Sequence, residues 1–257
     1  MGAPGGQTRI LHKLRCGCRV NFPSASFLNM RSLLQLIALA TLSRSLGVAG
    51  APAPEPAAEG ESGPALGCDV SNWQGNLNWA TIKSQGVQFA YIKATEGTTF
   101  IDSYFSQNYV GATNNGIIRG AYHFAHPDTS SGAAQANFFL AHGGGWSADG
   151  ITLPGAIDLE GSCAGLTAAQ MVSWIHDFAN TYHAATSSWW TSCTGNNAGF
   201  GSTSPLWIAH WAASIGTLPA GWSYTTFWQY ADSGTYPGDQ DLFNGDAAGL
   251  KRMALGS

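Results

Sequence analysis

The sequence is poor in charged residues, and this scarcity narrows the partners that the protein can have. Only 10% of the 257 residues are Asp, Glu, Lys or Arg. From residue 67 onward there are five basic residues against twelve acidic ones. Because proteins bind nucleic acid through Lys and Arg at the phosphates, no nucleic-acid partner is expected. The acidic balance also gives no long-range attraction to an anionic surface.

Several motifs of other enzyme classes are absent. No G-x-G-x-x-G turn follows the first predicted strand, which argues against a Rossmann fold. The HGGG run at 142–145 has no G-x-S-x-G elbow to complete a lipase site, so it is interpreted as a helix end. His123 and His126 lack a third ligand at a zinc spacing and are interpreted as core or rim histidines. No metal and no other cofactor is predicted.

The first 66 residues differ in composition from the rest. Residues 1–29 carry scattered Arg and Lys and are interpreted as an upstream artefact or a leader, with translation starting at Met30 or at Met1. Residues 30–51 have a short basic start, an apolar run too short to span a bilayer and an A-x-A end, which together are typical of a signal peptide. Residues 52–66 are predicted to be a disordered linker or pro-segment. The protein is therefore expected to be secreted, without a lasting membrane span.

Cysteine is also scarce. The chain has five, two of them in the predicted leader. Cys163 and Cys193 flank a helix-plus-loop segment and are predicted to form a disulfide, as suits a secreted protein. Cys68 is left over and is predicted to be a small buried residue.

From residue 67 short apolar runs alternate with amphipathic segments. The clearest helix is expected at 166–184, where Thr167 and Gln170 form a capping-box pair. The stretch 187–204 is interpreted as a loop. The other expected helices cover 78–86, 101–116, 131–145 and 247–255. The expected strands cover 66–70, 87–97, 117–127, 151–160, 205–212 and 225–231.

This alternation implies parallel strands joined by crossover helices. We therefore predict an α/β fold for residues 67–257, a distorted TIM-like (β/α) barrel with fewer helices in its second half. In such a barrel, polar residues at the strand ends gather at one mouth, where active sites lie. These residues are Asp69, Glu96, His123, Asp158, Glu160 and Gln229.

Asp158 and Glu160 form the most informative pair in this set. Residues i and i+2 of a strand share one face, about 6.6–6.8 Å apart along the chain. Most glycoside hydrolases use a pair of carboxyl groups that flank the bond to be cleaved, and two carboxylates on one face can supply such a pair. Because neither ionises easily beside the other, the pKa of one should rise, and that acid can protonate a glycosidic oxygen. A D-x-E pair can also be a structural ion-pair site, but only Lys93 and Arg119 fall near the predicted strand ends.

Five stretches together resemble glycoside hydrolase family 25, the N,O-diacetylmuramidase type of lysozyme. They are CDVSNWQG, YIKATEGTTF, RGAYHFAHP, GAIDLE and WQYADSG with GDQDLFNGD near the end. The resemblance implies a distorted barrel that cleaves the β-1,4 bond between N-acetylmuramic acid and N-acetylglucosamine. The implied partner is bacterial peptidoglycan, and the enzyme is expected to be a monomer.

The resemblance also implies roles for individual residues. Glu160 would be the general acid/base, and Asp158 would orient the 2-acetamido group of the sugar or act directly. Asp69 and Asp241 would complete an acidic ring. The sugar sites would be lined by Tyr122, Trp207, Trp228, Gln229 and Glu96. Retaining, inverting and substrate-assisted mechanisms all stay open.

The tryptophans have two expected uses. Trp73 and Trp211, like Trp207 and Trp228, could stack on sugars, because the indole ring is amphipathic and often half exposed. Trp174 lies on the long predicted helix and is expected in the core.

Two features depart from the family pattern. The loop between Glu160 and Cys163 is short, and no barrel strand is predicted near residue 187, so one strand of the wall is expected to be missing. A gene-model error, a genuinely shortened enzyme and an inactive relative that only binds glycan would each explain this. A chitinase-like hydrolase is another alternative, but Ala156 stands where its motif carries a further Asp.

Overall fold

The structure of the protein is a computed structural model that describes residues 11–14, 63–182 and 188–256. Apart from positions 11–14 and 63–66, the predicted leader, signal peptide and linker lie outside the described residues. Their processing therefore stays a prediction. Everything below concerns the compact unit to which the described residues belong.

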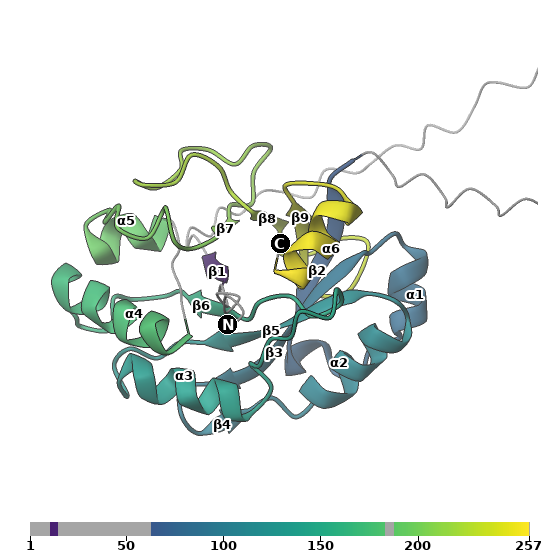
Figure 1. The fold of residues 1–257 in the computed structure, drawn as a ribbon, viewed down its shortest axis with the longest axis horizontal. Helices are drawn as coiled ribbons and strands as arrows, with labels where there is room; N and C mark the ends of the chain where they lie inside the picture. Colours follow the sequence, from purple (N-terminus) through teal and green to yellow (C-terminus); the bar gives the residue numbers. More distant parts are fainter. Residues whose placement is uncertain (1–10, 15–62, 183–187, 257) are drawn as a thin grey trace, which may run out of the picture. The chain divides into compact units, whose positions relative to one another are not determined.

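A curled mixed sheet forms the frame of this unit (Figure 1). Its strands follow the order β1-β6-β5-β3-β2-β9-β8-β7, and the short β4 pairs with β3. Neighbouring strands are parallel except where β9 and β4 take part. The strands are β1 (Leu11–Leu14), β2 (Ala65–Val70), β3 (Phe89–Glu96), β4 (Phe100–Ile101), β5 (Ile118–Phe124), β6 (Ala156–Leu159), β7 (Trp207–Ala209), β8 (Phe227–Ala231) and β9 (Asp239–Phe243).

Helices α1 to α5 lie around the outside of this sheet, whereas α6 packs against the interior cluster (Figure 1). After α5, the described part of the chain has no further α-helix until α6, which confirms a distorted TIM-like fold with fewer helices in its second half. The helices are the 3₁₀ turn η1 (Asn72–Gln74), α1 (Trp79–Ser84), α2 (Phe105–Asn114), α3 (Gly132–Ala141), α4 (Ala168–Tyr182), α5 (Ser188–Thr194) and α6 (Ala247–Leu255).

The long helix α4 begins at the predicted capping box. The backbone N–H of Gln170 donates to Thr167 Oγ1 at 3.3 Å, and the backbone N–H of Thr167 donates to Gln170 Oε1 at 2.9 Å. These two bonds satisfy donors that the first turn of a helix leaves free. Trp174 is 8% exposed and packs in the core as predicted. The buried stripe that faces α3 and the sheet consists of Met171, Ile175, Phe178 and Tyr182.

The interior of the barrel is filled by aromatic rings. Phe227 contacts Phe89, Tyr91 and Trp207, with ring centroids 5.0–5.7 Å apart. A glycine in the neighbouring wall makes room for one of these rings, since a Cβ on Gly67 would lie 2.2 Å from Phe89. Helix α6 adds Leu250 and Ala254 to the same cluster and closes the end of the barrel where the parallel strands begin.

Helix α5 and strand β9 are among the elements that the sequence analysis did not predict. Residues Ser188–Thr194 form helix α5, whereas the sequence analysis expected a loop over 187–204. Strand β9 was not predicted, and it runs antiparallel between β2 and β8 although all strands were expected to be parallel. The alternation of apolar and polar residues that marks a strand could not be recognised in β9, because its inward-facing positions, Asp239 and Asp241, are acidic rather than apolar.

The place between β6 and β7 is taken by β1. Its residues pair in parallel with β6, from Leu11 opposite Ala156 to Leu14 opposite Leu159, and β1 also lies beside β7. The sequence analysis expected the barrel wall to lack a strand here. No strand is described between α4 and α5, but a segment far away in the sequence occupies the position instead.

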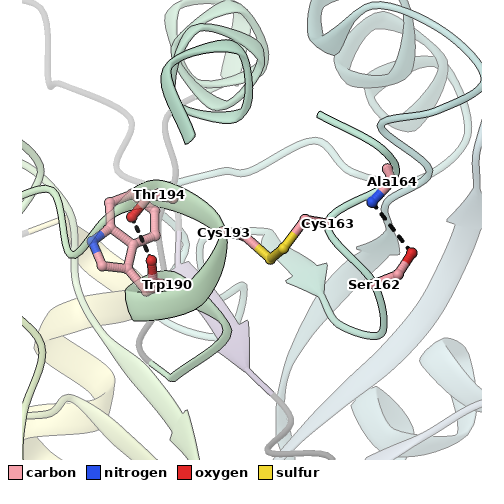
Figure 2. The surroundings of a disulfide bond; sticks show 6 residues. All are labelled: Ser162, Cys163, Ala164, Trp190, Cys193 and Thr194. Atoms are coloured by element: carbon pink, nitrogen blue, oxygen red, sulfur yellow. Dashed lines mark hydrogen bonds between the residues drawn. A yellow bond between two sulfur atoms is a disulfide. The ribbon is translucent and has the colours of Figure 1, made fainter. Parts of the chain in front are cut away.

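The structure joins Cys163 and Cys193 in a disulfide, as predicted, and leaves Cys68 buried with a free thiol. The bond links the segment after β6 to α5 (Figure 2), with the two Cα atoms 5.2 Å apart. Trp190, on the same helix, is fully buried and anchors α5 to the core.

We expect the double variant Cys163→Ser/Cys193→Ser to lose stability. The bond closes a loop with a sequence separation of 30 residues, so its loss should lower the free energy of unfolding by about 3–4 kcal/mol. Urea unfolding of oxidised wild type and variant measures this, and wild type under reducing conditions is the control. Equal urea midpoints for all three samples would contradict the prediction.

Candidate active site

The strand ends bring acidic side chains from both halves of the sheet to one mouth. Asp69 lies near the end of β2 and Asp158 near the end of β6. Because β9 is antiparallel to β2, its first residue, Asp239, lies opposite Asp69, and Asp241 lies opposite Gly67. The carboxyl ends of parallel strands are where barrel enzymes place their active sites.

The amide of Gln229 connects three elements of this mouth. Its Nε2 donates to Asp69 Oδ2 at 2.6 Å and to Asp239 Oδ2 at 2.8 Å. Its Oε1 accepts from Trp211 Nε1 at 3.2 Å. Gln229 is fully buried and Asp69 is 4% exposed. The Gln229 amide nitrogen therefore donates both of its hydrogen bonds to carboxylates, which are costly to bury without such donors.

Asp241 is held by a second buried donor. Trp207 Nε1 donates to Asp241 Oδ1 at 3.0 Å, and neither side chain is exposed to solvent. The Trp207 ring packs against Tyr91 and Phe227 inside the barrel. The sequence analysis placed Trp207 among the residues that line the sugar sites. Its complete burial corrects this, since Trp207 has no free face to stack on a sugar and instead positions Asp241.

Asp158 and Glu160 differ in exposure. Asp158 is 2% exposed, whereas Glu160 is the first residue after β6 and is partly exposed. The chain then turns at Gly161, whose positive φ of 80° is readily adopted only by glycine. Glu160 therefore keeps part of its surface accessible to solvent, while Asp158 is buried.

Glu96 lies at the rim within a cluster of charges. Glu96 Oε2 is 2.5 Å from Lys93 Nζ, and Glu96 Oε1 is 2.7 Å from His126 Nε2. The Lys93 ammonium also lies 4.8 Å from the ring centre of Phe124. Partial burial acts to raise the pKa of Glu96, but hydrogen bonds and charges from Lys93 and His126 outweigh it and hold that pKa below its usual value. Glu96 is thus kept ionised and is unsuited to act as a general acid.

The other candidate sugar contacts vary in accessibility. Tyr122 is 6% exposed, and Trp228 is half-buried with its Nε1 donating to the carbonyl of His210 at 2.8 Å. Trp73 and Trp211 stand out at 86% and 39% exposure. Trp73 follows β2 and Trp211 follows β7, so both tryptophans lie at the mouth end of their strands.

His123 belongs to the core rather than to the mouth. Its Nδ1 lies 2.7 Å from Thr95 Oγ1 and its Nε2 lies 3.0 Å from Gln135 Oε1. The ring packs between Phe139 and Phe178, between the sheet and its covering helices. Burial disfavours the charged ring and lowers the pKa of His123 to about 4.

Neither a metal site nor a membrane span is evident in the described ranges. Within them, no three His, Cys, Asp or Glu side chains are grouped so that they could hold a metal ion. No helix of residues 63–182 or 188–256 is long and apolar enough to cross a membrane. The HGGG run follows the end of α3, as expected for a helix terminus.

The sequence analysis missed Asp239 and the environment of Glu96. A signal for Asp239 was present, because Asp239 and Asp241 alternate along β9 just as Asp158 and Glu160 alternate at β6. The contact between Glu96 and His126 carried no comparable signal, since 30 residues separate them and only the pairing of β3 with β5 brings them together.

Residues 68–239 match the family model of glycosyl hydrolases family 25. The chain belongs to glycoside hydrolase family 25. It is 51% identical over 224 residues to an N,O-diacetylmuramidase of Arthroderma benhamiae, covering 81% of this chain and 95% of the relative. It is 50% identical over 207 residues to lysozyme M1 of Streptomyces globisporus, covering 73% and 70% of the two chains.

Solved structures of family 25 proteins share the fold. A muramidase from Acremonium alcalophilum superposes with a TM-score of 0.72 at 52% identity, covering 75% of this chain and 100% of the other. A lysozyme from Streptomyces coelicolor gives a TM-score of 0.71 at 48% identity, covering 76% and 99%. The distorted barrel of this glycoside hydrolase is therefore the barrel of its family.

His123 should make this family 25 domain less stable in acid. Between about pH 6.5 and 4 the unfolded chain binds a proton at His123 that the folded chain does not, so the free energy of unfolding falls as pH falls. The loss should be on the order of 2–3 kcal/mol. His123→Gln should weaken this dependence, as measured by urea unfolding at pH 7 and pH 4.5. His176→Gln, at an exposed histidine of α4, is the control, and an undiminished pH dependence in His123→Gln would refute the assignment.

Gln229→Leu should disrupt the acidic mouth. The buried Asp69 and the half-buried Asp239 would each lose one donor while the side-chain volume is nearly kept. The free energy of unfolding should therefore fall by about 1–3 kcal/mol, and hydrolysis should fall with it. Gln107→Leu, at an exposed position of α2, is the matched control. Chemical denaturation and turnover of a glycan substrate measure both effects. A fully active and stable Gln229→Leu variant would show that the bridge is dispensable.

Proposed function

We propose that this family 25 enzyme is a secreted lysozyme that hydrolyses the β-1,4 bond between N-acetylmuramic acid and N-acetylglucosamine in bacterial peptidoglycan. The observation that carries the proposal is the pair Asp158 and Glu160 at the end of β6, in the mouth of the barrel. The names of its relatives support the substrate, since several are called muramidase or lysozyme. A secreted monomer fits the predicted signal peptide and the disulfide.

Glu160 is the proposed general acid/base. It is the more accessible of the two carboxyls, so it is the one that a glycosidic oxygen could reach. A protonated Glu160 would give its proton to the glycosidic oxygen as the bond to the departing sugar breaks. It would then take a proton from the water that completes hydrolysis.

Asp158 is the proposed partner of the reacting sugar. Held nearly out of solvent, it would accept the N–H of the 2-acetamido group and orient the acetamido oxygen toward the anomeric carbon. Negative charge from Asp158, Asp69, Asp239 and Asp241 would favour the positive charge that develops on the sugar ring. Direct attack by Asp158, or by water, is the alternative that product stereochemistry would reveal.

The rim offers aromatic surfaces for the glycan chain. Trp73, Trp211 and Trp228 keep part of their rings accessible, and flat indole faces pack well on the apolar faces of sugars. Glu96 and Tyr122 lie on β3 and β5 at the same end of the barrel and would contribute hydrogen bonds.

Glu160→Gln tests the proposed acid directly. The amide keeps the shape of the side chain but cannot supply the proton, so turnover should fall by at least about 100-fold while the thermal midpoint stays within a degree or two. Asp177→Asn, on the outer side of α4, is the matched control and should keep wild-type turnover. A Glu160→Gln variant with wild-type rates would remove Glu160 from the mechanism.

The substrate is tested with purified peptidoglycan and the full chain. Mass spectrometry should find new reducing ends on N-acetylmuramic acid. Reducing ends formed only from chitin would identify a chitinase-like enzyme instead. A folded protein that sediments with peptidoglycan without forming reducing ends would be an inactive glycan-binding relative.

A further inference from the structure

A cavity of about 450 Å³ lies at the end of the barrel opposite the acidic mouth. Its walls come from residues 201–206 before β7, residues 222–226 before β8, the turn at 243–245 after β9, and helix α6 (yellow in Figure 1). Because β9 is antiparallel to β8, the end of β9 lies where β8 begins. None of the described residues assigned to the active site lines this cavity.

Hydrogen bonds fix the walls of the cavity to one another. Trp222 Nε1 donates to the carbonyl of Ser204 at 2.8 Å. Thr225 Oγ1 donates to the carbonyl of Leu206 at 3.1 Å. Asn244 Nδ2 donates to the carbonyl of Thr225 at 2.8 Å, which ties the turn after β9 to the same wall. Walls that are already fixed lose little conformational freedom when a ligand enters between them.

The lining combines aromatic rings with neutral polar groups. Tyr224 is 65% exposed and Trp146 is half-buried, and both belong to the lining. Ser202, Thr203 and Asn244 also line the cavity and are exposed, and their hydroxyl and amide groups can donate and accept hydrogen bonds. Aromatic rings beside such groups suit a sugar, because a sugar has apolar C–H faces and a rim of hydroxyls.

The lining is also rich in donors. Trp146 Nε1 is shielded from solvent and has no hydrogen-bond acceptor among the residues that the structure describes, although indole N–H groups usually have an acceptor when buried. Arg252 is the one charged side chain among the described lining residues, and its guanidinium carries five N–H donors. This lining therefore favours a ligand with many oxygen acceptors, such as the hydroxyl, acetamido and carboxyl oxygens of a cell-wall glycan.

We propose that this cavity is a second glycan-binding site, which holds one stretch of peptidoglycan while another stretch lies in the mouth. The inference rests on the proposed function. The seven residues of β5 rise about 3.3 Å each, so the two ends of the barrel are about 20 Å apart along its wall. Neighbouring sugars therefore cannot occupy both sites. Two sites that hold one polymer raise its apparent affinity, because the second binding event becomes intramolecular.

The variant Tyr224→Ala tests the site by sedimentation with insoluble peptidoglycan. Every sample is the full chain with Glu160→Gln, so that the glycan is not consumed. Loss of the aromatic wall should weaken the apparent affinity at least about tenfold. Leu140→Ala, at an exposed position of α3, is the control and should leave the affinity unchanged. Equal binding of Tyr224→Ala and its parent would overturn the proposal.

A kinetic comparison keeps Glu160 and uses two substrates. Tyr224→Ala should lower turnover of insoluble peptidoglycan at least about fivefold. It should leave turnover of a soluble peptidoglycan tetrasaccharide unchanged, because so short a fragment gains nothing from a second site when it is cleaved in the mouth. Equal losses on both substrates would place Tyr224 in the working of the mouth and would overturn the second site.

Hydrogen exchange locates the bound glycan on the full chain with Glu160→Gln. An excess of the tetrasaccharide should slow amide exchange at 201–206 and 222–226 as well as at 158–163 beside the mouth. Adding Tyr224→Ala should remove the protection of the first two segments and keep that of the third. Protection confined to 158–163 in the parent would overturn the second site.

The same measurements separate this inference from the proposed function. Protection at 222–226 that depends on Tyr224, in a protein whose form with Glu160 intact releases no reducing ends from peptidoglycan, would keep the second site and reject the proposed hydrolysis. New reducing ends without any protection at 201–206 and 222–226 would keep the hydrolysis and reject the second site.

Discussion

A single buried amide connects the two halves of this active site. Gln229 on β8 donates one hydrogen bond to Asp69 on β2 and another to Asp239 on β9. Without it, the buried Asp69 and the half-buried Asp239 would lie near one another with no shared donor, and their repulsion would oppose the pairing of the strands that carry them. The antiparallel strand β9 is what makes this bridge possible, because it brings its own acidic residues to the end where the parallel strands stop.

This arrangement shows how the site can hold several carboxylates although the chain has few basic residues. An active site that concentrates negative charge can satisfy it with cations, or with neutral donors that leave the charge in place. This barrel uses neutral donors for Asp69, Asp239 and Asp241, namely the Gln229 amide and the Trp207 indole. A neutral donor supports the carboxylate without cancelling the field that would stabilise a cationic transition state. The lysine at the rim pairs instead with Glu96.

Much of the fold could be predicted because its signals are local. The capping pair of α4 and the polar residues at the ends of β2, β3, β5 and β6 can be recognised within a few residues of sequence. β9 and α5 could not be predicted in this way. β9 has acidic residues where an apolar face is expected, and α5 depends on a disulfide and on a buried tryptophan. The paired carboxyls of the site were visible from their spacing, but the bridge at Gln229 depends on strand order. The place of Trp207 likewise depends on packing, which no local pattern encodes.

The disulfide has a consequence for binding as well as for stability. Only two residues separate Glu160 from Cys163, so the loop that carries the proposed acid is held by β6 on one side and by a covalent bond to α5 on the other (Figure 2). A loop anchored at both ends has few conformations to lose when a ligand arrives, and ordering a loop is one of the main entropic costs of association. Because this segment is short and anchored at both ends, its conformational entropy is lost when the protein folds rather than when the substrate binds. A longer loop at this position would have to become ordered each time a glycan is bound.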